Sequence, residues 1–152
     1  MTRIARRLAG LVLAGCYAGL ALASGLDRIS EFRPDAAGFV PEPFRVNAAR
    51  ALAVDALKAR RFEAALAEAR LALIRDPADA RSAGQFGSVM LASGDPEGAR
   101  AAFTLSAALG WRDAPTQLFW MAQALDAGDV KTASQRLDAL LRQDPRFEQR
   151  QQ

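Results

Sequence analysis

The sequence predicts an all-α protein, in which three helix-turn-helix repeats stack into an α-solenoid behind an N-terminal membrane or signal helix. Two observations lead to this fold class. The stretch from residue 46 to residue 145 repeats with a step of 34 positions, and a period of that length indicates stacked helical units. Residues 8–26 carry no charge and are mostly apolar, which is typical of a helix that enters a membrane.

The repeat is visible in several columns of the sequence. Asp76-Pro77 returns as Asp144-Pro145, and Trp111 lies 34 positions from each of these prolines. Other columns keep the same step without an insertion: Gly94-Asp95 with Gly128-Asp129; Ala65, Ala99 and Ala133; Leu57, Leu91 and Leu125; Leu52, Phe86 and Trp120. Alanine lets two helices approach closely, while the large residues are expected to fill the layer between stacked units.

Residues that start and stop helices divide each repeat into two helices. Pro77 ends one helix, because the residue before proline avoids the helical conformation. Gly94 and Gly128 can adopt the left-handed conformation that follows a helix. Four residues with N-capping side chains are expected to begin helices: Asn47, Asp95, Asp113 and Asp129. The expected helices cover residues 47–59, 62–75, 80–93, 96–109, 114–127 and 130–142.

A period of 34 residues with small central residues and a terminal Asp-Pro resembles the tetratricopeptide repeat. The resemblance implies three units at residues 46–79, 80–113 and 114–147, followed by a polar tail at 148–152. Each unit departs from the pattern: Arg60-Arg61 replaces Gly-Asp in the first, and Gly110-Trp111 replaces Asp-Pro at the end of the second.

Two of these departures carry structural expectations. Met121 occupies the column of Ala53 and Gly87, which indicates a looser or shifted helix crossing in the third unit. Trp111 is interpreted either as a plug between adjacent units or as an exposed anchor for a partner.

Composition and charge exclude several classes of function. Residues 1–26 contain three arginines and no acid; removing these from the 20 basic residues leaves 17, equal to the number of acidic residues. The repeats therefore carry no net charge, which argues against nucleic-acid binding. The chain has no histidine and one cysteine, and it shows no metal-ligand or phosphate-binding motif. We expect no catalytic site, no metal and no cofactor.

The N-terminal run allows three interpretations. As a helix, residues 8–26 would extend about 28 Å, close to the thickness of a bilayer core, and could form an uncleaved anchor. Ala21-Leu22-Ala23 before Ser24 has the form of a signal-peptidase site. Leu13-Ala14-Gly15-Cys16 resembles the lipobox of bacterial lipoproteins, which implies lipidation of Cys16, although apolar residues follow it.

All three interpretations place the repeats outside the cytoplasm, and basic residues before the run favour a cytoplasmic N-terminus. The expected location is the inner membrane with the repeats in the periplasm, or else secretion or lipid anchoring. Gly15, Gly19 and Ala23 share one helix face, where small residues could bring two membrane helices together in a homodimer. Residues 27–45 contain several prolines and are expected to form a partly extended linker, although Phe32, Phe39, Val40 and Phe44 are apolar enough to dock on the repeats.

The resemblance also implies a binding site, because in this family the first helix of each unit lines a groove that holds a partner peptide. The matching positions are Asn47, Arg50, Val54, Leu57, Arg81, Gly84, Ser88, Leu91, Pro115, Leu118, Ala122 and Leu125. Arg50 and Gln85 match loosely the clamp that some members use for a carboxylate. Val54, Pro115 and Phe119 replace its other residues, so the groove is expected to suit a helix or an apolar peptide.

The last expected helix raises the question of how the stack ends, because a solenoid needs a polar closing surface. Either Leu137, Leu140 and Leu141 face inward, or a partner covers this end. From the expected fold and cellular location, we expect a protein-interaction scaffold of the bacterial cell envelope, in polysaccharide export, pilus assembly, secretion or outer-membrane biogenesis. The alternative is a Cys16-lipidated pilotin or periplasmic chaperone for a secreted subunit; an enzyme would need a site built from carboxylates alone.

Overall fold

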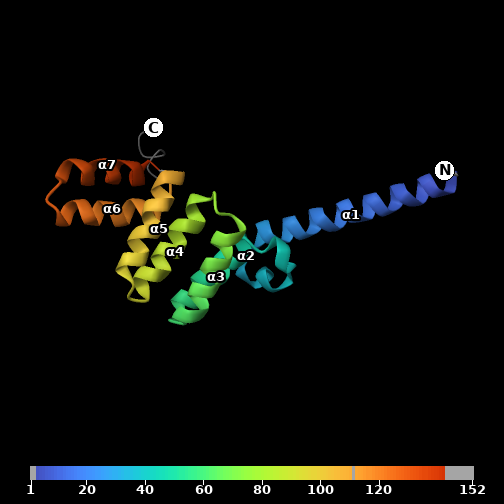
Figure 1. Cartoon of the computed structure of the whole chain (residues 1–152), viewed down its shortest axis with the longest axis horizontal. Coiled ribbons are helices and arrows are strands. Elements are labelled where there is room, and N and C mark those ends of the chain that lie inside the picture. Colours follow the sequence, from blue (N-terminus) through green and yellow to red (C-terminus); the bar gives the residue numbers. More distant parts are fainter. Residues whose placement is uncertain (1–2, 111, 143–152) are drawn as a thin grey trace, which may run out of the picture.

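In the computed structural model, which describes residues 3–110 and 112–142, the chain is helical and contains no strand within those ranges (Figure 1). The elements are α1 (Arg3–Ser30), η1 (Pro34–Phe39), η2 (Glu42–Phe44), α2 (Asn47–Lys58), α3 (Phe62–Arg75), α4 (Ala80–Ala92), α5 (Pro96–Leu109), α6 (Ala114–Asp126) and α7 (Val130–Leu141). The all-α class and the positions of the six expected helices are confirmed. Trp111, Asp144-Pro145 and the tail at 148–152 lie outside the described residues.

Consecutive helices pack in neighbouring pairs. Helix α2 packs on α3, α4 on α5 and α6 on α7, and each pair also contacts the next through α3 with α4 and α5 with α6. The first helices of the pairs touch one another as well, α2 with α4 and α4 with α6. Figure 1 shows the pairs following one another from the base of α1 to the C-terminal end of the described chain.

Small residues are buried where the helices cross. Ala65, Ala99 and Ala133 are all buried, as their common column predicts. The core beneath the first two pairs joins Ala53 and Ala56 of α2, Ala65 and Ala69 of α3 and Val89 of α4, with Leu57, Leu66 and Phe86 packed against it. A core of alanines gains less from burial than one of leucines, but it permits the close helix contacts on which the pairing depends.

The small-residue column differs between the second and third pairs. Buried Phe103 lies so close to Gly87 that a methyl group added there would come within 3.2 Å of the ring. At the corresponding position of the third pair, Met121 lines a cleft of about 210 Å³ between α6 and α7. The looser or shifted helix crossing expected at Met121 stays a prediction.

Helix α1 projects from the paired helices (Figure 1). Within its stretch Arg6–Ser30, a window of 18 residues has a mean hydropathy of 1.7, so by length and composition this helix could cross a membrane or act as a signal sequence. Gly15 and Gly19 are exposed, but Ala23 is buried within the chain itself. The three small residues therefore do not form one free face, and the dimer stripe expected from them does not extend to Ala23.

The segment between α1 and α2 is folded, so the expectation that residues 27–45 form a partly extended linker is wrong. Ala37 and Val40 form a buried cluster with Ala48 of α2, and Leu26, Phe44 and Leu52 pack against it. Arg45 forms an ion pair of 3.2 Å with Glu68 of α3. Only part of the expected docking occurs, because Phe32 and Phe39 remain exposed.

The start of α2 corrects a second expectation, because Asn47 does not cap this helix. Helix α2 begins at Asn47, and Val46 before it has no capping side chain. Instead, the carboxylate of Asp27, at the end of α1, accepts hydrogen bonds from the backbone N–H groups of Val46, Asn47 and Ala48 at 3.1, 3.1 and 2.9 Å. A carboxylate here also suits the positive end of the helix dipole, so α1 supplies the cap that the first repeat lacks.

Candidate functional site

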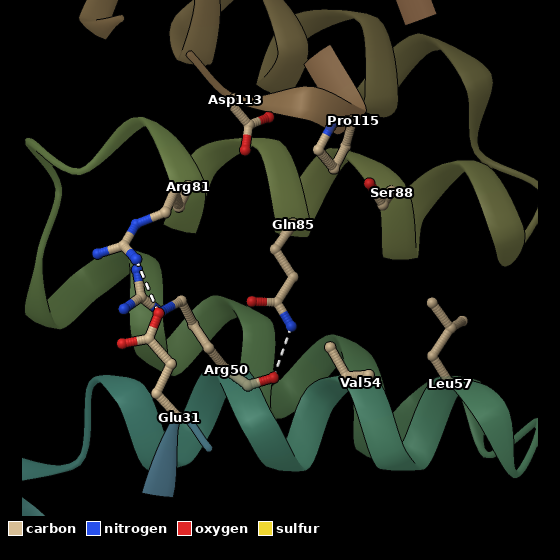
Figure 2. Close-up of a pocket in the computed structure, with 9 residues that line it drawn as sticks. All are labelled: Glu31, Arg50, Val54, Leu57, Arg81, Gln85, Ser88, Asp113 and Pro115. Atoms are coloured by element: carbon tan, nitrogen blue, oxygen red, sulfur yellow. Dashed lines mark hydrogen bonds and ion pairs between the residues drawn. The ribbon is translucent and has the colours of Figure 1, made fainter. Parts of the chain in front are cut away.

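The first helices of the three pairs line a groove with a volume of about 420 Å³ (Figure 2). Its walls come from Arg50, Val54 and Leu57 on α2, Arg81, Gln85 and Ser88 on α4, and Asp113 and Pro115 at the start of α6. Glu31, which directly follows α1, completes one end. We call this hollow the proximal groove, because it begins at the base of α1.

A second hollow of about 560 Å³ adjoins the first and shares Ser88 and Pro115 with it. Its other residues come from α4, α5 and α6: Leu91, Ala92, Phe103, Leu118, Phe119, Ala122 and Gln123. We call it the distal groove. Since the two hollows share residues, they offer one continuous surface along α2, α4 and α6.

The proximal groove has a charged end and an apolar end. At the charged end, Arg81 forms an ion pair of 2.9 Å with Glu31, and both side chains are partly exposed to solvent (Figure 2). Arg50 is more enclosed and forms an ion pair with Asp79. Val54 and Leu57 stand at the other end, as Figure 2 shows.

Hydrogen bonds between neighbouring helices fix the walls of the proximal groove. The amide of Gln85 donates to the backbone carbonyl of Arg50 at 2.6 Å and so ties α4 to α2 (Figure 2). Asp113 caps α6 by accepting from the Thr116 backbone N–H at 3.0 Å and from its hydroxyl at 2.6 Å. The Ser106 hydroxyl of α5 lies 2.7 Å from the same Thr116 hydroxyl, within hydrogen-bonding distance. These bonds hold the groove open in a defined shape.

The apolar part of the surface is open to solvent. Val54 is 39% exposed, Leu91 46% and Leu118 51%. Aliphatic side chains that line a concave surface and remain in contact with water gain free energy when a partner covers them. The surface can therefore bind an apolar segment, and the ion-paired arginines at one end can orient it.

Nine of the twelve positions expected in the groove from the sequence line these two hollows: Arg50, Val54, Leu57, Arg81, Ser88, Leu91, Pro115, Leu118 and Ala122. Asn47 instead makes contacts inside the protein, since its amide donates to Asp27 at 2.8 Å and its oxygen accepts from Arg50. Leu125 lines the separate cleft between α6 and α7. Gly84, also expected in the groove, is buried against Asp113 and Thr116.

The grooves also contain residues that sequence reasoning did not single out. Phe103 and Gln123 reach the distal groove, and Glu31 reaches the proximal groove from outside the repeats. The 34-residue step could not have indicated Glu31, because this residue precedes the first unit.

Three further observations bear on chemistry. Cys16, the lipidation candidate, is exposed on α1. Within residues 3–110 and 112–142, the structure holds no group of three or more His, Cys, Asp or Glu side chains arranged to bind a metal ion. Comparisons with models of known families, with curated proteins and with solved structures found no match.

Proposed function

We propose that the chain is a membrane-attached, non-catalytic scaffold of the bacterial cell envelope, built from three tetratricopeptide-like repeats, whose continuous groove binds a helix or extended apolar segment of a partner protein. The observation that carries this proposal is that nine residues, related by a 34-residue step in the sequence, line two adjoining grooves. The contacts of α2 with α4 and of α4 with α6 support the same stacking of units.

The membrane attachment rests on α1, which is retained as an anchor in this proposal. Asp27 and Leu26 belong to the folded core, so the end of the apolar helix is also part of the first repeat. Glu31 additionally binds Arg81 of the second pair. Two separate contacts therefore fix the groove relative to the helix, and a partner would be held close to the membrane at a raised local concentration.

Site-specific photo-crosslinking in native membranes tests the binding proposal. A photoreactive amino acid would replace Val54 in the proximal groove, Leu118 in the distal groove, or Ile74 on α3, which is 64% exposed and lines neither groove. We expect one crosslinked product, of the same mass, from Val54 and Leu118 and none from Ile74. A Leu91→Asp substitution between the two positions should abolish both products, because it places a charge in the apolar surface.

Equal crosslinking from all three positions, or a product from Ile74 alone, would contradict the proposal.

The same membranes can be used to distinguish a membrane-spanning anchor from the lipoprotein alternative. Incorporation of radioactive palmitate that disappears in Cys16→Ser would establish lipidation and would replace the anchor with a lipid.

A further inference from the structure

The free length of α1 is shorter than a bilayer core. The uncharged run from residue 8 to residue 26 measures about 28 Å as a helix, against about 30 Å for the hydrocarbon layer. Within this run, the continuously exposed part covers only residues 8–22, which measure about 22 Å as a helix. Ala23 is buried and Leu26 packs on the cluster formed with η1 and α2.

This difference places part of the folded protein at the membrane surface. If α1 spans the bilayer, the last turn of its apolar run crosses the boundary where η1 and α2 already cover it. Figure 1 shows the segment between α1 and α2, in teal, lying beside the base of α1. The surface of this segment must then meet lipid head groups.

That surface carries two large aromatic side chains that the fold leaves in solvent. Phe32 is 81% exposed and Phe39 77%, and Ile29 of α1 is 49% exposed. Neither phenylalanine contributes to the buried cluster beneath it. Apolar and aromatic side chains exposed beside a membrane-spanning helix gain free energy by entering the boundary between head groups and acyl chains.

We propose that Ile29, Phe32 and Phe39 form an interfacial patch that docks on the head-group region of the leaflet from which α1 emerges. The proposal rests on the membrane attachment proposed above. Docking would fix the tilt of the repeats, so that the groove starting at Glu31 lies next to the membrane. It adds a second membrane contact to the helix itself.

The partner of the patch is the apolar boundary of the lipid layer and not its charge. Segment 27–46 carries slightly more acid than base: Asp27, Glu31, Asp35 and Glu42 against Arg28, Arg33 and Arg45. Arg33 is also paired with Asp35 at 3.5 Å. Attraction to anionic lipids therefore contributes little, and docking should be the same on zwitterionic and anionic bilayers.

A spin label placed between the two phenylalanines tests the proposal on the full chain in nanodiscs. Cys16→Ser removes the single cysteine, and Gly38→Cys introduces a label at an exposed position with open space around it. Labels at Leu20→Cys and Ile74→Cys report the membrane span and the aqueous side of the domain. Collisions of each label with oxygen, which enters lipid, and with a water-soluble nickel chelate give its depth.

We expect the label at residue 20 to lie in hydrocarbon, the label at 74 to be open to nickel, and the label at 38 to be several-fold protected from nickel. Phe32→Ser with Phe39→Ser should raise nickel access at residue 38 to the value at residue 74. The matched control, Leu105→Ser with Val130→Ser, changes two exposed apolar residues far along the chain and should leave residue 38 protected.

The possible outcomes distinguish failure of the patch proposal from failure of the anchor proposal. A label at residue 38 as open to nickel as that at 74, with residue 20 in hydrocarbon, overturns the patch and leaves the anchor intact. A label at residue 20 that is open to nickel overturns both proposals. Protection of residue 38 that occurs only with anionic lipid also overturns the patch, because it would make charge the cause.

Discussion

The first and third helix pairs are built alike but are stabilised by different means. The third pair has favourable local chemistry: Gly128 turns the chain with a φ of 72°, and Asp113 and Asp129 cap α6 and α7. The first pair has Arg60 in the left-handed conformation at a φ of 55°, and no side-chain cap of its own on α2 or α3. Instead, α1, η1 and η2 pack against this pair and stabilise it.

The third pair lacks comparable cover within the described residues. There α7 packs on α6, Ala133 is its one buried residue, and Leu137 and Leu141 are 46% and 37% exposed. Inward-facing leucines are one of the two alternatives for this end of the stack, and the exposure of these two residues disagrees with that alternative. The comparison separates two sources of stability, local turn chemistry and long-range packing, and it predicts that packing dominates.

Removing the cap that Asp27 of α1 provides for α2 should have the largest effect on stability. Asp27→Ala leaves three backbone N–H groups at the start of α2 without their acceptor and should cost about 2–3 kcal/mol of the free energy of unfolding. Denaturant unfolding of the full chain in micelles, followed by circular dichroism, measures it. The control Glu31→Ala removes an ion pair at the surface and should cost about 1 kcal/mol or less; equal losses would refute the role of Asp27.

Identical truncations at the two ends should differ in cost. Leu52→Ala opens the cluster that covers the first pair and should cost about 2 kcal/mol. Leu137→Ala removes the same atoms from a half-exposed site and should cost about 0.5 kcal/mol. The same unfolding experiment compares them, and similar losses would show that the outer face of α7 is covered after all.

Repairing the turn of the first pair should stabilise it. Arg60→Gly relieves a left-handed conformation that costs a non-glycine residue about 1–2 kcal/mol. Arg61 has φ and ψ of −90° and 72°, close to the −84° and 78° of the capping residue Asp129, so Arg61→Asp should add a cap worth about 1 kcal/mol. The double variant should unfold at higher denaturant, whereas unchanged stability would show that neighbouring contacts already accommodate the arginine.

The cap of α7 should be visible in the titration of Asp129, with the smallest effect on stability. Hydrogen bonds from the Thr132 hydroxyl, at 2.6 Å, and from its backbone N–H lower the pKa of Asp129 below 3.8. A lowered pKa means that this stabilisation is complete above pH 3.8 and is lost as the pH falls through the folded-state pKa. Carboxyl NMR should detect this, and Thr132→Val should raise the pKa towards 3.8.

The sequence predicted what depends on local chemistry and missed what depends on distant contacts. Pro96, Gly94 and the capping aspartates place helix ends to within about a residue because each acts on its own turn. Most of the positions expected in the groove line the two hollows, since the 34-residue step relates equivalent positions on the first helices of the three pairs. Asp27 and Glu31 could not be placed, because their partners lie about 20 and 50 positions away and no period links them.

Residue-resolved hydrogen exchange on the full chain in nanodiscs tests the central claim most directly, namely that the end of α1 completes the first helix pair. The account predicts that the amides of Val46, Asn47 and Ala48 exchange as slowly as those of α4, and that the amides of α7 exchange fastest among the paired helices. Fast exchange at residues 46–48, equal to that of α7, would contradict it.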